Sequence, residues 1–428
     1  MSSEVLEHSL ASLCLLVADC PHATPEWTAS GVVVLRNQNI KGGRLDLSAP
    51  SFTDEAHYLG RIRRAAPQEG DLVITREAPM GEVCQIPAGL KCCLGQRQVL
   101  LRPDPEKVDS RFLLYALQSP YLQHQIGWNE GAGSTVSNLR IPVLEALKVP
   151  TPSVATQREV ASVLGALDDR ITLLRETNAT LEAIAQALFK SWFVDFDPVH
   201  AKAEGREPEG MDATTAALFP DSFEESEPGL VPKGWCYSTV GLSFILTMGQ
   251  SPPGDTYNET GEGLPFYQGR TDFGFRFPKQ RIFCTEPTRL ASAGDTLVSV
   301  RAPVGDVNIA LEPCALGRGV AGLRHPKGHQ SFVFYAVRCL KPHFEMYDGE
   351  GTVFGSINKK DFQALPVVVP SEEVLRAFEA VVAPLDAAVE NNEQKLRSLT
   401  QLRDTLLPRL ISGQLRLPEA EATVEEVL

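Results

Sequence analysis

The sequence lacks the features that mark membrane, secreted and disulfide-bonded proteins. Its apolar runs all fall short of the ~20 residues that a membrane-spanning helix needs. Its N-terminus, Met1–Glu4, has no basic flank of the kind that opens a signal peptide. Its nine cysteines form no CxxC pair, so their spacing indicates neither a disulfide framework nor a zinc site. We therefore expect a cytoplasmic protein with reduced, mostly buried thiols.

An excess of basic charge is also absent, although such an excess is common in proteins that bind nucleic acids. The chain has 40 Lys and Arg against 54 Asp and Glu, a formal net charge of −14. The acidity is local, because residues 194–230 carry 2 basic against 10 acidic side chains. Residues 1–150 carry 14 against 16, and residues 231–370 carry 14 against 12. These near-neutral blocks allow a basic face on each, but composition alone does not predict DNA binding.

Complete catalytic motifs are missing as well. Residues 54–57 spell the DEAH box of helicases, but the chain has no GxxxxGK[ST] loop to hold a nucleotide. Residues 251–254 approach an adenine-methyltransferase motif without its aromatic residue. The carboxylates and lysine within residues 103–107 are too close together to hold Mg²⁺ as nucleases do. We expect no catalytic site and no metal site in this chain, and the pattern favours a recognition or scaffold role.

The sequence contains an internal repeat. Residues 70–81 begin with Gly-Asp, continue through a β-like run and end in Ala-Pro-Met-Gly. Residues 294–305 repeat this order 224 positions later, with Val in place of Met. Residues 133–152 recur in part at 351–370, at an offset of 218. Each copy mixes alternating strands with a helical stretch and ends in a long helix, so the repeat predicts two similar domains.

Two long helices are predicted where the apolar period changes from 2 to 3.5. In both, the seam residues follow a 4,3,4,3 spacing over more than four heptads, which is a strong coiled-coil signal. The first seam contains Val160, Leu164, Leu167, Ile171, Leu174, Asn178, Leu181, Ala185, Leu188 and Trp192. The second contains Phe378, Val382, Leu385, Val389, Asn392, Leu396, Leu399, Arg403, Leu406 and Leu410. Two amphipathic helices that each pack on their own domain are the alternative.

The seams also predict how the two helices pair. If the helices run antiparallel, each seam residue faces a partner whose number adds with its own to 570. Asn178 then faces Asn392, and a buried Asn pair of this kind commonly fixes register. Arg403 fits the apolar seam poorly, and we expect it to bind a partner or extend outward. The register residues are Asn178, Asn392, Leu181, Leu396, Trp192 and Phe378.

The sequences of the two helices resemble those of type I restriction–modification specificity subunits. The similar segments are residues 167–171 and 181–196 in the first helix and residues 402–413 in the second. The resemblance covers nearly the whole chain, and it is specific in the helices but loose in the globular parts. It implies an α+β fold with two similar target-recognition domains, which are separated by two long antiparallel coiled-coil helices in a pseudo-twofold internal repeat.

The predicted boundaries follow from the repeat and from this resemblance. Residues 195–231 read as an acidic linker with four prolines and three glycines, and residues 414–428 as an acidic tail that we expect to be disordered. The other segments are recognition domain 1 at 1–152, the central helix at 153–194, recognition domain 2 at 232–370 and the distal helix at 371–413.

The resemblance implies a non-catalytic subunit that binds a bipartite, asymmetric site on double-stranded DNA. A coiled coil of about 33 residues would span on the order of 50 Å, more than one ~34 Å turn of DNA. The implied partners are two methyltransferase subunits and restriction/translocase subunits, to which S-adenosylmethionine, Mg²⁺ and ATP would belong. A fragment of a single-chain restriction–modification enzyme and a protein-binding coiled-coil scaffold are the alternatives.

Candidate DNA contacts are polar side chains at corresponding places in the two copies. Arg, Asn, Gln, Ser and Thr read base edges, and Arg and Lys contact the backbone. In the first copy the candidates are Arg36, Asn37, Gln38, Asn39, Lys41, Arg44, Gln96, Arg97, Ser134 and Thr135. In the second copy they are Gln268, Arg270, Arg276, Arg318 and Thr352. For each Arg and Lys, a solvated surface position is the alternative.

Overall fold

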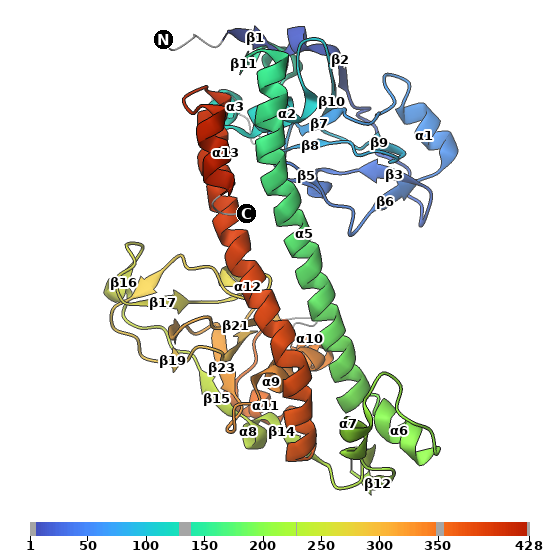
Figure 1. Ribbon diagram of the computed structural model, residues 1–428, viewed down its shortest axis with the longest axis vertical. Coiled ribbons are helices and arrows are strands. Elements are labelled where there is room, and N and C mark those ends of the chain that lie inside the picture. Colours follow the sequence, from blue (N-terminus) through green and yellow to red (C-terminus); the bar gives the residue numbers. More distant parts are fainter. Residues whose placement is uncertain (1–5, 128–137, 228, 348–354, 426–428) are drawn as a thin grey trace. The chain divides into compact units, whose positions relative to one another are not determined.

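The structure is a computed structural model that describes residues 6–127, 138–227, 229–347 and 355–425 (Figure 1). The chain divides into two compact units. Unit 1 comprises residues 1–173 and 395–428, and unit 2 comprises residues 174–394. Both boundaries fall inside long helices, α5 (Val154–Phe193) and α12 (Glu372–Ile411), so each unit contains part of each helix. The predicted ends of the two helices lie within two residues of these bounds.

Unit 1 is a mixed α and β unit. Before α5 it contains β1 (Glu7–Ser9), η1 (Leu10–Leu13), β2 (Cys14–Asp19), β3 (Val32–Leu35), η2 (Asn37–Asn39), β4 (Ile40–Lys41), β5 (Arg44–Leu45), β6 (Ser51–Thr53), α1 (Glu55–Arg61), β7 (Leu72–Thr75), β8 (Val83–Gln85), β9 (Cys92–Leu94), β10 (Gln98–Pro103), α2 (Ser110–Gln118), α3 (Pro120–Gly127), α4 (Ile141–Ala146) and β11 (Lys148–Pro150). After α12 it contains α13 (Leu417–Glu425).

Unit 2 has a similar content. Its elements are α6 (Asp197–Ala203), α7 (Ala213–Ala217), β12 (Phe223–Ser226), β13 (Gly229–Pro232), β14 (Cys236–Thr239), α8 (Val240–Ser243), β15 (Ile245–Met248), η3 (Gly254–Thr256), β16 (Tyr257–Asn258), β17 (Leu264–Tyr267), η4 (Arg270–Asp272), β18 (Phe283–Cys284), β19 (Leu290–Ala291), β20 (Thr296–Val300), β21 (Val304–Ile309), β22 (Cys314–Leu316), β23 (Val320–Arg324), α9 (Gln330–Cys339), α10 (Lys341–Glu345), α11 (Lys359–Ala364) and β24 (Pro366–Val369).

Each unit contains a four-stranded antiparallel sheet with the same pattern of connections. The strand order is β2-β10-β7-β8 in unit 1 and β15-β23-β20-β21 in unit 2. Every residue of the inner strands β7 and β20 is buried, as expected for β-branched and aliphatic side chains in the middle of a covered sheet. Each unit also pairs two strands in parallel, β3 with β9 and β17 with β22.

The segments that the sequence repeat pairs carry the same local contacts. Asp71 accepts a hydrogen bond from the Gln68 amide at 2.9 Å and pairs with Arg102 at 2.8 Å. Asp295, 224 positions later, accepts one from the Ser292 amide at 2.8 Å and pairs with Arg324. The same aspartate therefore closes a turn and pairs with an arginine of an adjacent inner strand in both units.

The long helices contribute their seams to the cores of both units. In unit 2, the ring of Trp192 on α5 lies 5.8 Å from that of Phe378 on α12. Farther along, the side-chain Nδ2 of Asn392 donates to the side-chain Oδ1 of Asn178 at 2.8 Å, the contact that the register predicts. The contacts 192–378 and 178–392 together mean that the helices run antiparallel in unit 2.

The same direction holds in unit 1, because Val160 and Leu410 line one groove at one end and Asp168 contacts Arg403 farther along. Arg403 on α12 donates to the carboxylate of Asp168 on α5 at 2.9 Å. The sequence predicted that Arg403 would either bind a partner or extend outward. In the structure its partner is Asp168 of the same chain. Of the other register residues, Leu396 is buried in unit 1, and Leu181 is half-buried in unit 2.

Two expectations about connecting segments require correction. The predicted linker, residues 195–231, is folded onto unit 2, where Phe196, Val199 and Phe219 are buried in its aromatic core. The predicted disordered tail forms α13, which buries Ala420 and Val424. In both segments a few spaced apolar residues are buried, and the acidic composition concealed that pattern. Within the described ranges, no helix is both long and apolar enough to cross a bilayer.

The Asn contact in the helix pair leads to a stability prediction. Asn178→Leu removes the acceptor of the Asn392 amide and also the donor to Glu393 Oε1, which lies 2.9 Å from Asn178 Nδ2. Asn392 and Glu393 are half-buried, so the loss of their hydrogen bonds should lower the free energy of unfolding by about 1 kcal/mol, as measured by urea denaturation.

The control is Gln394→Leu, which replaces an exposed polar side chain on α12. We expect this variant to stay within about 0.5 kcal/mol of the wild type. Equal unfolding midpoints for wild type and Asn178→Leu would contradict the role given to the Asn pair.

Candidate functional site

The candidate site of unit 1 begins where its two parallel strands end. Leu35 of β3 pairs with Leu94 of β9, and the Gly95 amide then donates to the Leu35 carbonyl at 2.8 Å. A Cβ at Gly95 would lie 2.4 Å from that carbonyl oxygen, so only glycine allows this approach. The two polar segments that follow these strands, beginning at Arg36 and at Gln96, are therefore neighbours, although about 60 residues separate them in the sequence. We call this junction the unit 1 corner.

Unit 2 has an equivalent junction at the ends of β17 and β22, which we call the unit 2 corner. Tyr267 pairs with Leu316, and the Gly317 amide donates to the Tyr267 carbonyl at 2.8 Å. A Cβ at Gly317 would lie 3.0 Å from the Gln268 Cα. The predicted DNA-contact candidates Gln268 and Arg318 of the second copy therefore also lie together at the carboxyl ends of two parallel strands.

The unit 1 corner presents a cluster of exposed polar and cationic side chains. Arg36, Gln38, Lys41 and Arg97 are all exposed. The Arg36 guanidinium carbon lies 5.4 Å from the centre of the Trp27 ring. Cationic, amide and aromatic side chains together are the groups that contact phosphates and bases.

Glu77, which the sequence analysis did not single out, organises this corner. Its carboxylate lies 3.1 Å from Arg97 Nε and accepts a hydrogen bond from the Asn138 amide at 2.6 Å. Its carbonyl accepts one from the Asn37 amide at 2.5 Å. Glu77, two residues after β7 of the four-stranded sheet, thus holds two predicted DNA-contact candidates, Asn37 and Arg97, in place. Its position just before the repeated Ala-Pro-Met-Gly was the only signal in the sequence.

The unit 2 corner differs in charge at the equivalent place. Arg301 lies 224 positions after Glu77 and is exposed. Gln268, Arg270 and Arg318 are exposed as well. Arg270 pairs with Asp306, and Arg318 Nε donates to Ser251 Oγ at 3.2 Å. The two corners share a backbone plan but present different side chains to a ligand.

Some of the predicted contacts shape the corner from inside. Asn39 is buried, and its side chain accepts from the Arg36 amide and donates to the Asp46 carbonyl, each at 2.9 Å. It stabilises the turn instead of reaching a ligand, so the interpretation of Asn39 as a DNA contact was wrong. Gln96 is half-buried and donates to the His22 carbonyl at 2.6 Å. Ser134, Thr135 and Thr352 lie outside the described residues.

Arg276 also requires correction. It is 1% exposed and donates to Asp386 on α12 at 2.8 Å and to the Tyr335 hydroxyl at 3.0 Å. Arg44 in unit 1 likewise points toward a long helix, where it donates to the Asp168 carbonyl at 3.0 Å. After the 3₁₀ turns η2 and η4 the chain turns toward a long helix, and the sequence alone did not reveal this direction. A buried Arg276 cannot reach DNA in this structure.

Burial limits the reactivity of two thiols in the sheet strands, Cys84 on β8 and Cys314 on β22. All nine cysteines are free thiols. Burial raises the pKa of Cys84 and of Cys314 to about 12, so neither thiol is a nucleophile near neutral pH. Among the described residues, no three His, Cys, Asp or Glu side chains are placed to hold a metal ion together.

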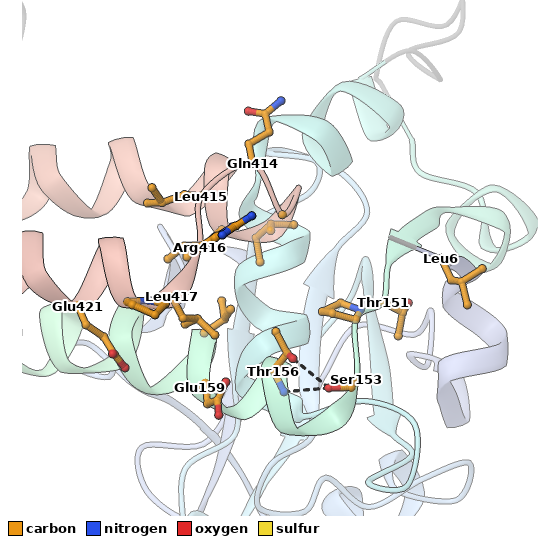
Figure 2. Close-up of a pocket in the computed structure, with 16 residues that line it drawn as sticks. Leu6, Thr151, Ser153, Thr156, Glu159, Gln414, Leu415, Arg416, Leu417 and Glu421 are labelled. Carbon is orange, nitrogen blue, oxygen red and sulfur yellow. Dashed lines mark hydrogen bonds between the residues drawn. The ribbon is translucent and has the colours of Figure 1, made fainter. Parts of the chain in front are cut away.

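Unit 1 also has an open groove of about 1050 Å³ (Figure 2). The first turn of α5 and the turn between α12 and α13 line it, with apolar residues such as Val160, Leu410 and Leu417. The Ser153 hydroxyl caps the start of α5 by accepting from the Thr156 backbone N–H at 3.2 Å, and it lies 2.9 Å from the Thr156 hydroxyl. The residues that line the groove include neither histidine nor cysteine.

Comparison with known proteins identifies the class. Residues 31–183 match the family model described as the type I restriction modification DNA specificity domain. The putative type I restriction enzyme MjaX specificity subunit of Methanocaldococcus jannaschii is 30% identical over 397 residues, which cover 90% of this chain and 88% of that protein. The HindI specificity subunit of Haemophilus influenzae is 26% identical over 343 residues, with 67% and 73% coverage. The chain therefore belongs to the type I restriction–modification specificity subunits.

A solved structure supports the fold. The type I restriction–modification S subunit from M. genitalium aligns over 95% of both chains with a TM-score of 0.58 at 18% identity. The HsdS subunit from Thermoanaerobacter tengcongensis aligns over 96% of this chain and 97% of its own, at 24% identity and a TM-score of 0.36. The first of these shares the mixed helix and sheet architecture described above.

The different environments of Arg276 and Arg270 lead to a second prediction. Arg276→Ala leaves the Asp386 carboxylate without its buried cation, although Glu182 keeps Arg338, and should lower the free energy of unfolding by about 3–5 kcal/mol. Arg270→Ala breaks an exposed pair with Asp306 and should cost about 1 kcal/mol or less. Urea denaturation of the purified variants measures both. Equal destabilisation by the two substitutions would contradict a structural role for Arg276.

Proposed function

We propose that this chain is the sequence-recognition subunit of a type I restriction–modification complex, and that it binds a bipartite, asymmetric site on double-stranded DNA. The observation that carries the proposal is the corner at the ends of two parallel strands, which occurs once in each unit with exposed Arg and Gln side chains. Two similar corners with different side chains, such as Glu77 and Arg301, suit two half-sites of different sequence.

The spacing of the two half-sites would come from the long helices. We propose that α5 and α12 form an antiparallel coiled coil and relate two target-recognition domains by a pseudo-twofold axis. The buried seams and the antiparallel contacts within each unit support this arrangement. A continuous helix of 40 residues spans about 60 Å, more than one ~34 Å turn of DNA. A stretch of unread DNA between the half-sites would follow.

The chemistry of the complex would belong to other subunits. In this proposal the chain is non-catalytic and cytoplasmic, and it directs two methyltransferase subunits and restriction/translocase subunits to the site. Those partners would bind S-adenosylmethionine, Mg²⁺ and ATP. The family to which the chain belongs supports this division of roles.

Sequencing of methylated bases in the host, before and after deletion of this chain, tests the proposed function. A methylated motif with two specified halves and an unspecified spacer should disappear on deletion. Methyl transfer by the purified chain alone would instead indicate a single-chain enzyme or its fragment. An unchanged methylation pattern, with no DNA footprint when methyltransferase subunits are supplied, would indicate a protein-binding scaffold.

The two corners generate a prediction about specificity. Arg97→Gln should relax one half of the methylated motif, and Arg318→Gln should relax the other half, because each side chain is exposed in a different unit. A lost bidentate contact to a base corresponds to about 1–3 kcal/mol, or roughly 5- to 150-fold in discrimination at that position. Long-read sequencing of DNA methylated by the variant complexes measures the change.

The control for unit 2 is Arg206→Gln, since Arg206 is exposed and pairs only locally with Glu204 in the turn after α6. We expect it to leave both halves of the motif unchanged. Relaxation of the same half by Arg97→Gln and Arg318→Gln would be incompatible with one half-site for each unit.

A further inference from the structure

An aspartate occurs at the same place on each long helix. Asp168 on α5 and Asp386 on α12 are 218 positions apart, which is the offset of the two seams. Each accepts a hydrogen bond from a tyrosine on the first helix after the central sheet of its unit. Tyr115 Oη on α2 lies 2.9 Å from Asp168, and Tyr335 Oη on α9 lies 3.0 Å from Asp386. Burial raises the pKa of both phenols, so each hydroxyl remains a donor.

The same two aspartates accept hydrogen bonds from the end of each segment that carries the candidate DNA contacts. Arg44 follows Arg36 by eight residues, and Arg276 follows Gln268 by eight residues. Arg44 donates to the Asp168 carbonyl at 3.0 Å, and Arg276 donates to the Asp386 carboxylate at 2.8 Å. A segment that begins with exposed side chains at the corner is therefore tied at its other end to a long helix.

The opposite helix completes each group with a charge. In unit 1, Arg403 of α12 donates to Asp168 at 2.9 Å. In unit 2, Glu182 of α5 lies 3.3 Å from Arg276. Each tyrosine, arginine and aspartate thus joins one globular part to both helices of its unit. We call Tyr115, Arg44 and Asp168 the unit 1 clamp, and Tyr335, Arg276 and Asp386 the unit 2 clamp.

Buried polar networks of this kind set geometry more than they add stability. Arg276 is enclosed, with its guanidinium carbon 4.1 Å from the centre of the Phe334 ring. Burial by itself would lower the pKa of Arg276, but Tyr335, Asp386 and Glu182 raise it above its ordinary value. Apolar side chains of similar volume often stabilise a core as well as a buried ion pair does, but hydrogen bonds have direction. A clamp therefore defines how the globular part is oriented on the helices.

We propose that the two clamps are positioning elements, each of which orients one recognition corner on the helix pair so that its side chains meet their own half-site. The inference rests on the proposed function. It assigns no direct DNA contact to the clamp residues. Loss of one clamp should misalign one corner and leave the other in place, because each clamp lies within one unit.

The test uses conservative variants that remove one hydroxyl each. Tyr115→Phe and Tyr335→Phe retain the buried rings but lose the bond to the aspartate. The matched control is Tyr257→Phe on β16, which removes a hydroxyl bonded to the Pro252 carbonyl at 2.8 Å, with no bond to a long helix. Each full-length variant is expressed with the methyltransferase subunits in the presence of a randomised DNA library, and the methylated sites are sequenced.

We expect Tyr335→Phe to reduce base discrimination about tenfold in one half of the motif, and Tyr115→Phe to do so in the other half. Tyr257→Phe should leave both halves unchanged. A residue that contributes only stability would lower methylation of all sites evenly and leave the base preferences as they are. An even loss, no change, or the same effect from Tyr257→Phe would overturn the proposal.

Hydrogen–deuterium exchange of the free chain separates failure of the clamp from failure of the proposed function. Tyr335→Phe should speed exchange in α9 and in residues 270–277 and leave unit 1 unchanged. Unaltered exchange there would overturn the clamp even if the wild-type complex methylates a bipartite motif. If the wild type yields no motif, the proposed function fails and the exchange result alone decides whether the clamp exists.

Discussion

The apolar seams of the two long helices are the constraint on which the rest of the structure depends. A 40-residue helix with one apolar stripe is unstable in water unless that stripe is covered. In each unit, α5 and α12 cover one another in antiparallel directions, and the globular part packs against the pair. In unit 2 the seam continues into an aromatic core in which Phe193 of α5 contacts Phe332 and Phe378.

Polar contacts give this apolar packing its direction. Hydrophobic burial is non-directional and would tolerate a shifted helix pair. The Asn178–Asn392 hydrogen bond in unit 2 and the Asp168–Arg403 ion pair in unit 1 each demand one alignment. The same aspartate also receives Tyr115, so the alignment of the helices and the placement of the globular part depend on shared atoms.

The recognition corners show how a repeated backbone supports different chemistry. Parallel strand pairs require that both strands end at the same edge, and glycines at 95 and 317 let the following loops touch. These features are the same in the two units. The side chains that reach solvent differ, as Arg36 and Gln268 illustrate, because packing constrains the scaffold residues but not the exposed ones.

The sequence by itself determined the repeat, the long helices and their register. Each seam is a local periodic pattern along one helix, and the single Asn in each seam indicates which positions face one another. The sequence also placed the polar strings of the corners. Only the tertiary structure decided which of those side chains face inward, as Arg276 and Asn39 do, and that residues 195–231 fold onto a core. Composition identifies residues that are able to bind, but the path of the backbone decides what each one meets.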